Sequence, residues 1–386
     1  MGHSRGGEAV VRLDEMLNGS SKFQVKAVCS LSPTDYRGFS DKPLVVNTSK
    51  TKPYLVVYGG LDQDVRGMKT PGRRPAGTGF RLYDRCSGDK AMVFIPFACH
   101  VRFNSIWEAS GNEGRTASGT PIPINADALA DTVHKKLANE YIGGFFDLAL
   151  NRDLALADLF NNTKKNSASI PAAIQWHFGA NVDVIEDFNQ PPGTPVAGAG
   201  TQVIEFTSID TPATATTGSR DMHVQHLTQA CLIDLAAVAS ARTVIEKKFS
   251  TGVNQFRDLT AFDGVSFRLG LLYPVAPDQQ AIDAVLPPSF DFSVTDDKTK
   301  THKIASAKVY KLLANDWVKP ALKVIETRNG TIMFLQTVMI DFKTLKANNV
   351  GTNVDYARIE NLKIDFATPT GGTGEIWLDT IALFKR

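Results

Sequence analysis

The heptapeptide GHSRGGE (residues 2–8) decides how this sequence is interpreted. It contains the pattern G-x-S-x-G, in which a serine occupies a tight turn between a strand and a helix. Glycines two residues before and after the serine allow the close backbone approach that leaves its hydroxyl exposed above a sheet. The next residues, AVVRL (9–13), are compatible with the helix. Because such a pentapeptide also arises by chance, its meaning depends on the rest of the chain.

Three short apolar segments follow the heptapeptide and are typical of strands buried on both faces of a parallel sheet. They span residues 25–31, 54–58 and 91–98. The second runs into the acidic loop GGLDQDV (59–65), and the third runs into a histidine within FACHVRFN (97–104). A carboxylate at the end of one strand can orient an imidazole from the next loop, which can then deprotonate a serine. The order of serine, acid and histidine therefore predicts a catalytic triad.

These three segments resemble the α/β-hydrolase superfamily, in the branch of chlorophyllase-like, dienelactone-hydrolase-like and polyester-hydrolase enzymes. The resemblance covers about residues 1–115. It implies Ser4 as nucleophile, Asp62 as triad acid, His100 as general base and the backbone N–H of Arg5 as an oxyanion donor. Asp64 is an alternative acid, but the family places the carboxylate nearer the end of the strand, which favours Asp62.

The resemblance also implies that the first half of a hydrolase sheet, with the second oxyanion donor, would precede residue 1. We therefore expect an N-terminally truncated enzyme with weak or no esterase activity in this form, and secretion is plausible for the full-length protein. The first predicted domain, residues 1–165, includes helices over about residues 124–163. Gly143 and Gly144 are expected to break them into two.

Residues 174–386 alternate apolar and polar side chains in short segments separated by turns, and predict an all-β sandwich or jelly roll. The fold class is thus α/β followed by all-β. The pattern is similar to galactose-binding-like jelly rolls and carbohydrate-binding modules. The predicted strands span residues 182–188, 202–206, 243–249, 265–273, 289–295, 332–342, 359–366 and 375–384.

Three interpretations of this second domain stay open. Exposed aromatic side chains would stack on sugar faces in a carbohydrate- or polymer-binding module, or they would fill the core of a structural or oligomerisation domain. The third interpretation is a structural calcium ion held by carboxylates. The aromatic candidates are Trp176, Trp317, Trp377 and Tyr310, and the weak calcium candidates are Glu186, Asp187 and Asp379.

The composition of the chain argues against several classes of function. The 42 basic and 40 acidic residues give a net charge of +2 without a basic cluster, so a nucleic-acid binder is not expected. No apolar stretch is long enough for a membrane span. Cys29, Cys86, Cys99 and Cys231 have no metal-site spacing, although the first three leave room for one disulfide. The sequence predicts no catalytic cofactor or metal, since His223 and His226 lack further ligands.

Two functions are compatible with these observations. The first is a serine hydrolase that acts on carboxylic esters or polyesters through Ser4, Asp62 and His100. The alternative is a non-catalytic binding or structural protein with a carbohydrate- or polymer-binding β-sandwich. The sequence leaves the substrate and the oligomeric state open.

Overall fold

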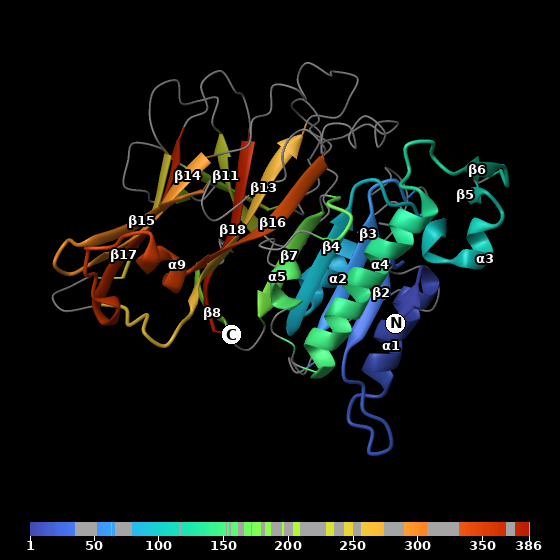
Figure 1. Cartoon of the computed structure of the whole chain (residues 1–386), viewed down its shortest axis with the longest axis horizontal. Helices are drawn as coiled ribbons and strands as arrows, with labels where there is room; N and C mark the ends of the chain where they lie inside the picture. Colours follow the sequence, from blue (N-terminus) through green and yellow to red (C-terminus); the bar gives the residue numbers. More distant parts are fainter. Residues whose placement is uncertain are drawn as a thin grey trace.

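A computed structural model gives the fold. It describes residues 1–34, 52–62, 64–65, 79–115, 118–151, 153, 156–160, 166–170, 172–178, 182–186, 195–196, 204–208, 229–234, 243–249, 256–273, 289–306, 332–367 and 375–385. Within these ranges the chain forms a mixed sheet flanked by helices, and beside it two larger antiparallel sheets (Figure 1). A small two-stranded antiparallel sheet joins β5 (Asn112–Arg115) to β6 (Pro121–Pro123).

The first sheet has the strand order β1-β2-β3-β4-β7. Its first four strands run parallel, as predicted, and β7 lies antiparallel to β4. Residues 174–178, which the sequence predicts to belong to the second domain, therefore complete the sheet of the first. The strands are β1 (Gly2–His3), β2 (Val28–Leu31), β3 (Tyr54–Gly59), β4 (Asp89–Ile95) and β7 (Ala173–Phe178).

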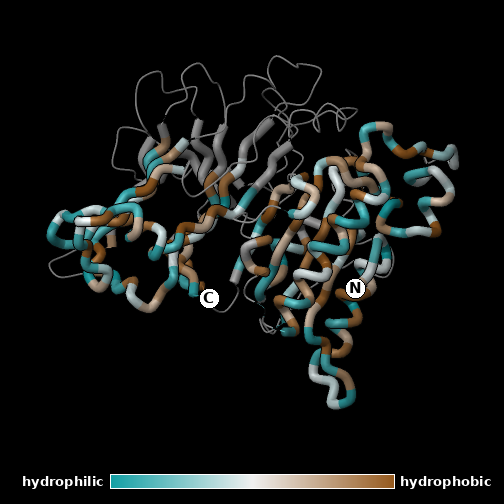
Figure 2. The backbone as a smooth tube through the Cα atoms, viewed as in Figure 1, coloured by the Kyte–Doolittle hydropathy of each residue, from teal (hydrophilic) through white to brown (hydrophobic). Residues whose placement is uncertain are grey.

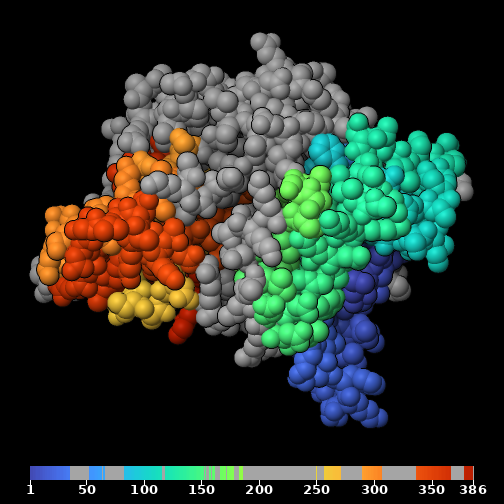
Figure 3. All heavy atoms as spheres, in the orientation of Figure 1, coloured from blue at the N-terminus to red at the C-terminus, as the bar shows by residue number. Residues whose placement is uncertain are grey.

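Both faces of this sheet are covered, which explains why β3 and residues 91–95 of β4 are continuously apolar (Figure 2). Side chains such as Leu55 and Val57 face α4 (Asp131–Phe146) and α5 (Ala157–Phe160). Figure 1 shows α4 in front of the strands, and atoms of this part of the chain form the surface there in the space-filling view (Figure 3). The neighbours of Leu55 and Val57, such as Val56, belong to a second core cluster with α1 (Arg5–Met16), α2 (Gly79–Arg85) and the antiparallel sheets.

The helix α4 runs straight through Gly143 and Gly144, so the predicted break there is wrong. Leu137, Tyr141 and Phe145 are buried against the sheet, and this packing outweighs the low helix propensity of glycine. A Cβ atom at Gly144 would lie 3.3 Å from the Leu159 side chain. That glycine allows α5 to approach α4. The helix ends in a short π-helical segment, η2 (Asp147–Asn151).

The rest of the described chain forms a β-sandwich, as predicted. A seven-stranded sheet has the order β16-β13-β18-β11-β10-β9, with β8 also paired to β18, and a four-stranded sheet has the order β12-β17-β14-β15. Phe267 of β13 meets Phe290 of β14 across the core, with ring centroids 5.5 Å apart. The strands are β8 (Val182–Glu186), β9 (Pro195–Val196), β10 (Ile204–Ser208), β11 (Gln229–Asp234), β12 (Thr243–Lys248), β13 (Gly264–Tyr273), β14 (Ser289–Asp296), β15 (Thr301–Ala305), β16 (Ile332–Asp341), β17 (Ile359–Ala367) and β18 (Glu375–Phe384).

All eight predicted strands of the second region are found within a few residues of their predicted bounds. Three strands, β9, β11 and β15, are not predicted from the sequence. β9 has only two residues, β11 (QACLID) has an apolar centre without alternation, and a buried position of β15 (THKIA) is the polar residue His302. The sequence analysis also missed β7 as a strand of the first sheet.

The β-sandwich contacts the first sheet through polar groups in addition to the apolar cluster that they share. The Thr337 hydroxyl accepts a hydrogen bond from the Trp176 N–H at 2.8 Å and donates one to the Trp176 carbonyl at 3.1 Å. Arg268 of β13 pairs with Asp84 of α2 at 3.0 Å and with Asp379 of β18. Burial disfavours its charge, but the two carboxylates hold the pKa of Arg268 above its usual value.

We expect Arg268→Leu to lower the free energy of unfolding by about 3–5 kcal/mol, because two buried carboxylates lose the guanidinium with which they pair. Arg358→Leu is the matched control. Its guanidinium is 44% exposed beside Asp297, so its loss should cost no more than about 1 kcal/mol. Urea unfolding followed by circular dichroism measures both. Equal losses in the two variants would contradict this role for Arg268.

Candidate active site

Ser4 occupies a strained turn between β1 and α1. Its backbone angles are φ 56° and ψ −123°, a combination that non-glycine residues rarely adopt. The Ser4 N–H donates to the Leu31 carbonyl at 2.9 Å, and the Ser4 carbonyl accepts the Gly7 N–H at 2.9 Å. The turn is therefore held by the neighbouring strand and by the helix that it begins.

The glycines of the heptapeptide contribute unequally to this turn. A Cβ atom at Gly2 would lie 2.0 Å from the Gly6 carbonyl oxygen, which is sterically impossible, whereas a Cβ atom at Gly6 would meet nothing within 4 Å. A Cβ atom at Gly7 would lie 2.9 Å from the Cβ of Pro33. The close approach thus depends on Gly2 and Gly7.

Asp62 and His100 meet at the carboxyl ends of β3 and β4. Asp62 Oδ2 lies 2.7 Å from His100 Nδ1, and both side chains are 1% exposed. The other oxygen, Asp62 Oδ1, accepts the N–H groups of Asp64 at 3.0 Å and Val65 at 2.7 Å. These bonds fix the carboxylate so that it can orient the imidazole.

His3 links the serine turn to this pair. It directly precedes Ser4, and its ring centroid lies 4.4 Å from that of His100. Burial and the nearby His100 lower the pKa of His3 to about 3, so its imidazole is neutral. The structure therefore gives His3 a packing position beside His100.

Asp64 does not lie where a triad acid would. Its Oδ2 is 3.5 Å from His100 Nε2, on the opposite side of the imidazole from Asp62. Nε2 is the atom that would have to accept the serine proton. The geometry therefore favours Asp62 over the alternative, Asp64, as the orienting acid.

Glu113 was missed by the sequence analysis. It lies on β5 (Asn112–Arg115), is 1% exposed and accepts the His100 backbone N–H at 3.0 Å. Burial raises the pKa of its carboxyl. No spacing or motif marks this residue, because β5 reaches His100 only after the intervening η1 (Val101–Phe103) and α3 (Ser105–Glu108).

The charges around His100 decide its protonation. Burial alone would lower the pKa of the imidazole, but Asp62, Asp64 and Glu113 together raise it above the ordinary value.

Trp107 of α3 covers the site, with its ring centroid 6.1 Å from His100 and 5.4 Å from His3. The Asn104 side chain fixes this helix by accepting the Ile106 and Trp107 N–H groups.

The remaining histidines within the described chain have packing positions. His134 is fully buried with its ring 4.5 Å from Phe103, and burial lowers its pKa to about 3. His302 bonds Tyr356 at 3.1 Å and the Thr352 carbonyl at 2.8 Å. His223 and His226 lie outside the described residues. Cys29, Cys86 and Cys99 are buried, and none of the three forms a disulfide.

The structure also bears on the predicted ligand residues of the β-sandwich. Asp379 forms an ion pair with Arg268. Asp187 and the Glu186 side chain lie outside what the structure describes, so the calcium site stays a prediction. No group of three potential metal ligands occurs among the described residues. Trp176 is half-buried against Phe160, with ring centroids 5.5 Å apart. Trp317, Tyr310 and the Trp377 side chain are also outside the described part.

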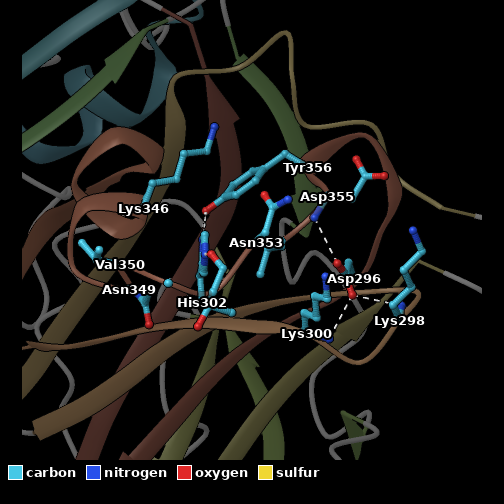
Figure 4. Close-up of a pocket in the computed structure, with 13 residues that line it drawn as sticks. Asp296, Lys298, Lys300, His302, Lys346, Asn349, Val350, Asn353, Asp355 and Tyr356 are labelled. Atoms are coloured by element: carbon cyan, nitrogen blue, oxygen red, sulfur yellow. Dashed lines mark hydrogen bonds between the residues drawn. The ribbon is translucent and has the colours of Figure 1, made fainter.

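A polar pocket of about 600 Å³ opens on the β-sandwich, between the β14–β15 turn, α9 (Phe342–Ala347) and η5 (Tyr356–Arg358) (Figure 4). Asp296 organises its floor by accepting the backbone N–H groups of Lys298, Lys300 and Asp355, each within 3.0 Å. The Lys346 ammonium lies 4.1 Å from the centre of the Tyr356 ring.

None of the described helices is long and apolar enough to cross a membrane.

Comparisons with known proteins give only distant similarities. No family model and no curated relative matches the chain. One similar solved structure is the family 30 carbohydrate-binding module of a cellulosomal cellulase of Clostridium thermocellum, with 13% identity, a TM-score of 0.30, and 53% of this chain and 98% of that chain covered. An exo-β-agarase is 9% identical with a TM-score of 0.25, and the match covers 47% of this chain and 22% of that chain. The family 11 carbohydrate-binding module of another Clostridium thermocellum cellulase is 9% identical with a TM-score of 0.19, and the match covers 40% of this chain and 86% of that chain. Similarity this weak carries no argument about fold or function.

We expect Gly2→Ala to lower the free energy of unfolding by about 3 kcal/mol, because the new methyl group overlaps the Gly6 carbonyl. Gly6→Ala is the matched control within the same motif. It has open space in the first turn of α1 and should be neutral or stabilising by up to about 1 kcal/mol. Thermal and urea unfolding report both values. A Gly2→Ala variant as stable as the control would contradict the close approach.

Proposed function

We propose that the chain carries the catalytic triad of a serine hydrolase acting on carboxylic esters, with Ser4 as nucleophile, His100 as general base and Asp62 as orienting acid. The observation that carries this proposal is the buried 2.7 Å contact between Asp62 Oδ2 and His100 Nδ1 beside the strained Ser4 turn. The parallel order of β1–β4 supports the α/β-hydrolase resemblance as its framework.

The proposed reaction follows from the atoms at the site. His100 Nε2 takes the Ser4 hydroxyl proton while Oγ bonds to the ester carbonyl carbon. The backbone N–H of Arg5, at the start of α1 where helical N–H groups have no partner within the helix, stabilises the oxyanion. His100 then protonates the leaving alkoxide, and water activated by the same nitrogen releases the acid from the acyl-enzyme.

A fluorophosphonate probe tests this proposal, because it forms a covalent bond with an activated serine even where turnover is slow. We expect one adduct per chain, mapped to Ser4 by mass spectrometry. Ser4→Ala should abolish the adduct, and Asp62→Asn should slow it by about 10³–10⁴-fold because the imidazole loses its orienting partner. Ser110→Ala, at an exposed serine, is the control and should label normally. A folded chain that leaves Ser4 unlabelled would refute the proposal.

A second candidate function is saccharide binding by the β-sandwich, and the pocket beside Tyr356 favours it. A volume of about 600 Å³ suits a ligand of small-molecule size. Its Asp296 carboxylate is saturated by backbone donors, and Asp355 Oδ1 accepts the Ala357 N–H at 3.1 Å. The pocket is also lined by three lysines, Lys298, Lys300 and Lys346. Their positive charge favours a saccharide that bears carboxylate or sulfate groups.

Calorimetric titration with oligogalacturonate tests this binding. We expect Lys346→Ala to weaken the affinity at least fivefold, because its ammonium borders the pocket (Figure 4). The control, Lys343→Ala, removes an exposed lysine from the same helix outside the pocket and should leave the affinity unchanged. Absence of any heat of binding, or equal effects of both variants, would count against the pocket.

A further inference from the structure

His100 lies between two carboxylates that contact opposite nitrogens. Asp62 Oδ2 is 2.7 Å from Nδ1, which is the contact expected in a triad. Asp64 Oδ2 is 3.5 Å from Nε2, and Nε2 itself is buried and forms no hydrogen bond within the described chain. The proton-accepting nitrogen of the proposed base thus faces an anion.

The two carboxylates are held very differently. Asp62 is buried and accepts two backbone N–H groups, so it is fixed. The Asp64 side chain is 38% exposed, and its contact with His100 is an ion pair that exists only when the imidazole is protonated. Asp64 can therefore exchange this contact for water without breaking other bonds seen in the described chain.

The other groups that face His100 do not compete for Nε2. His3, from β1, is neutral because burial lowers its pKa to about 3. Glu113, from β5, accepts the backbone N–H of His100 through Oε2. Trp107, from α3, contributes an uncharged ring. Asp64 is thus the one charge among these neighbours that contacts the catalytic nitrogen.

We propose that Asp64 is a pH-dependent latch on the general base. It pairs with Nε2 of the protonated His100, which in that state cannot accept the Ser4 proton, and the contact is released when the imidazole becomes neutral. This inference rests on the proposed function and adds a positioning residue that sets the pH range in which the site works. Because an adjacent anion favours the charged imidazole, removing it should let His100 act as a base at lower pH.

Two measurements on Asp64→Asn test the latch. Imidazole NMR of ¹⁵N-histidine-labelled protein, with His100 assigned through His100→Gln, gives its pKa directly. Fluorophosphonate labelling of Ser4 as a function of pH gives the midpoint of the rise in rate. We expect both midpoints to fall by about 1 pH unit, with the high-pH labelling rate within twofold of the unsubstituted chain. Asp127→Asn, at an exposed loop carboxylate, should change neither.

The outcomes separate the two proposals. A His100 pKa that is unchanged in Asp64→Asn overturns the latch, and so does a shifted pKa with an unshifted labelling midpoint. A high-pH labelling rate reduced more than 100-fold also overturns it, since Asp64 would then take part in the reaction itself. If Ser4 is never labelled, the proposed function fails while the NMR titration still tests the ion pair. Asp64→Ser, which keeps the backbone N–H donated to Asp62, repeats the test if Asp64→Asn does not fold.

Discussion

The parallel pairing of β1 to β4 is the constraint on which the candidate site depends. Hydrogen bonds between these strands bring their carboxyl ends to one edge of the sheet, and Ser4, Asp62 and His100 each follow one of them. The packing of His3 on His100 then joins the first strand to the last of the three loops. Without this register, nothing in the chain would bring Ser4 and His100, which are almost a hundred residues apart in sequence, to the same edge of the sheet. The strained backbone of Ser4 persists because β2 and α1 both bond to it.

The sequence predicts most of this arrangement because the relevant patterns are local. Continuous apolar segments identify β2, β3 and β4, and the order of serine, acid and histidine predicts the Asp62–His100 contact. The sequence cannot place Glu113 or Asp64, because their roles depend on how loops return to His100 in space. It also misjudges Gly143 and Gly144, where the burial of Tyr141 and Phe145 decides the conformation against local propensity.

The β-sandwich is predicted for a different reason. Alternation with a period of two is visible in each of its long strands, and the aromatic contact between Phe267 and Phe290 shows the two patterned faces meeting. What alternation does not reveal is the connection to the first sheet through Arg268, Asp84 and Thr337. Those residues bring the two regions into contact, so the stability of the first sheet is expected to depend on the β-sandwich.

The central claim is that Ser4 is a nucleophile activated by His100. A crystal structure of the chain after reaction with a fluorophosphonate tests it most directly. The account predicts phosphorus bonded to Ser4 Oγ, a phosphoryl oxygen within hydrogen-bond distance of the Arg5 N–H, and His100 Nε2 turned toward the adduct. An unmodified Ser4, or an adduct on another residue, would contradict it.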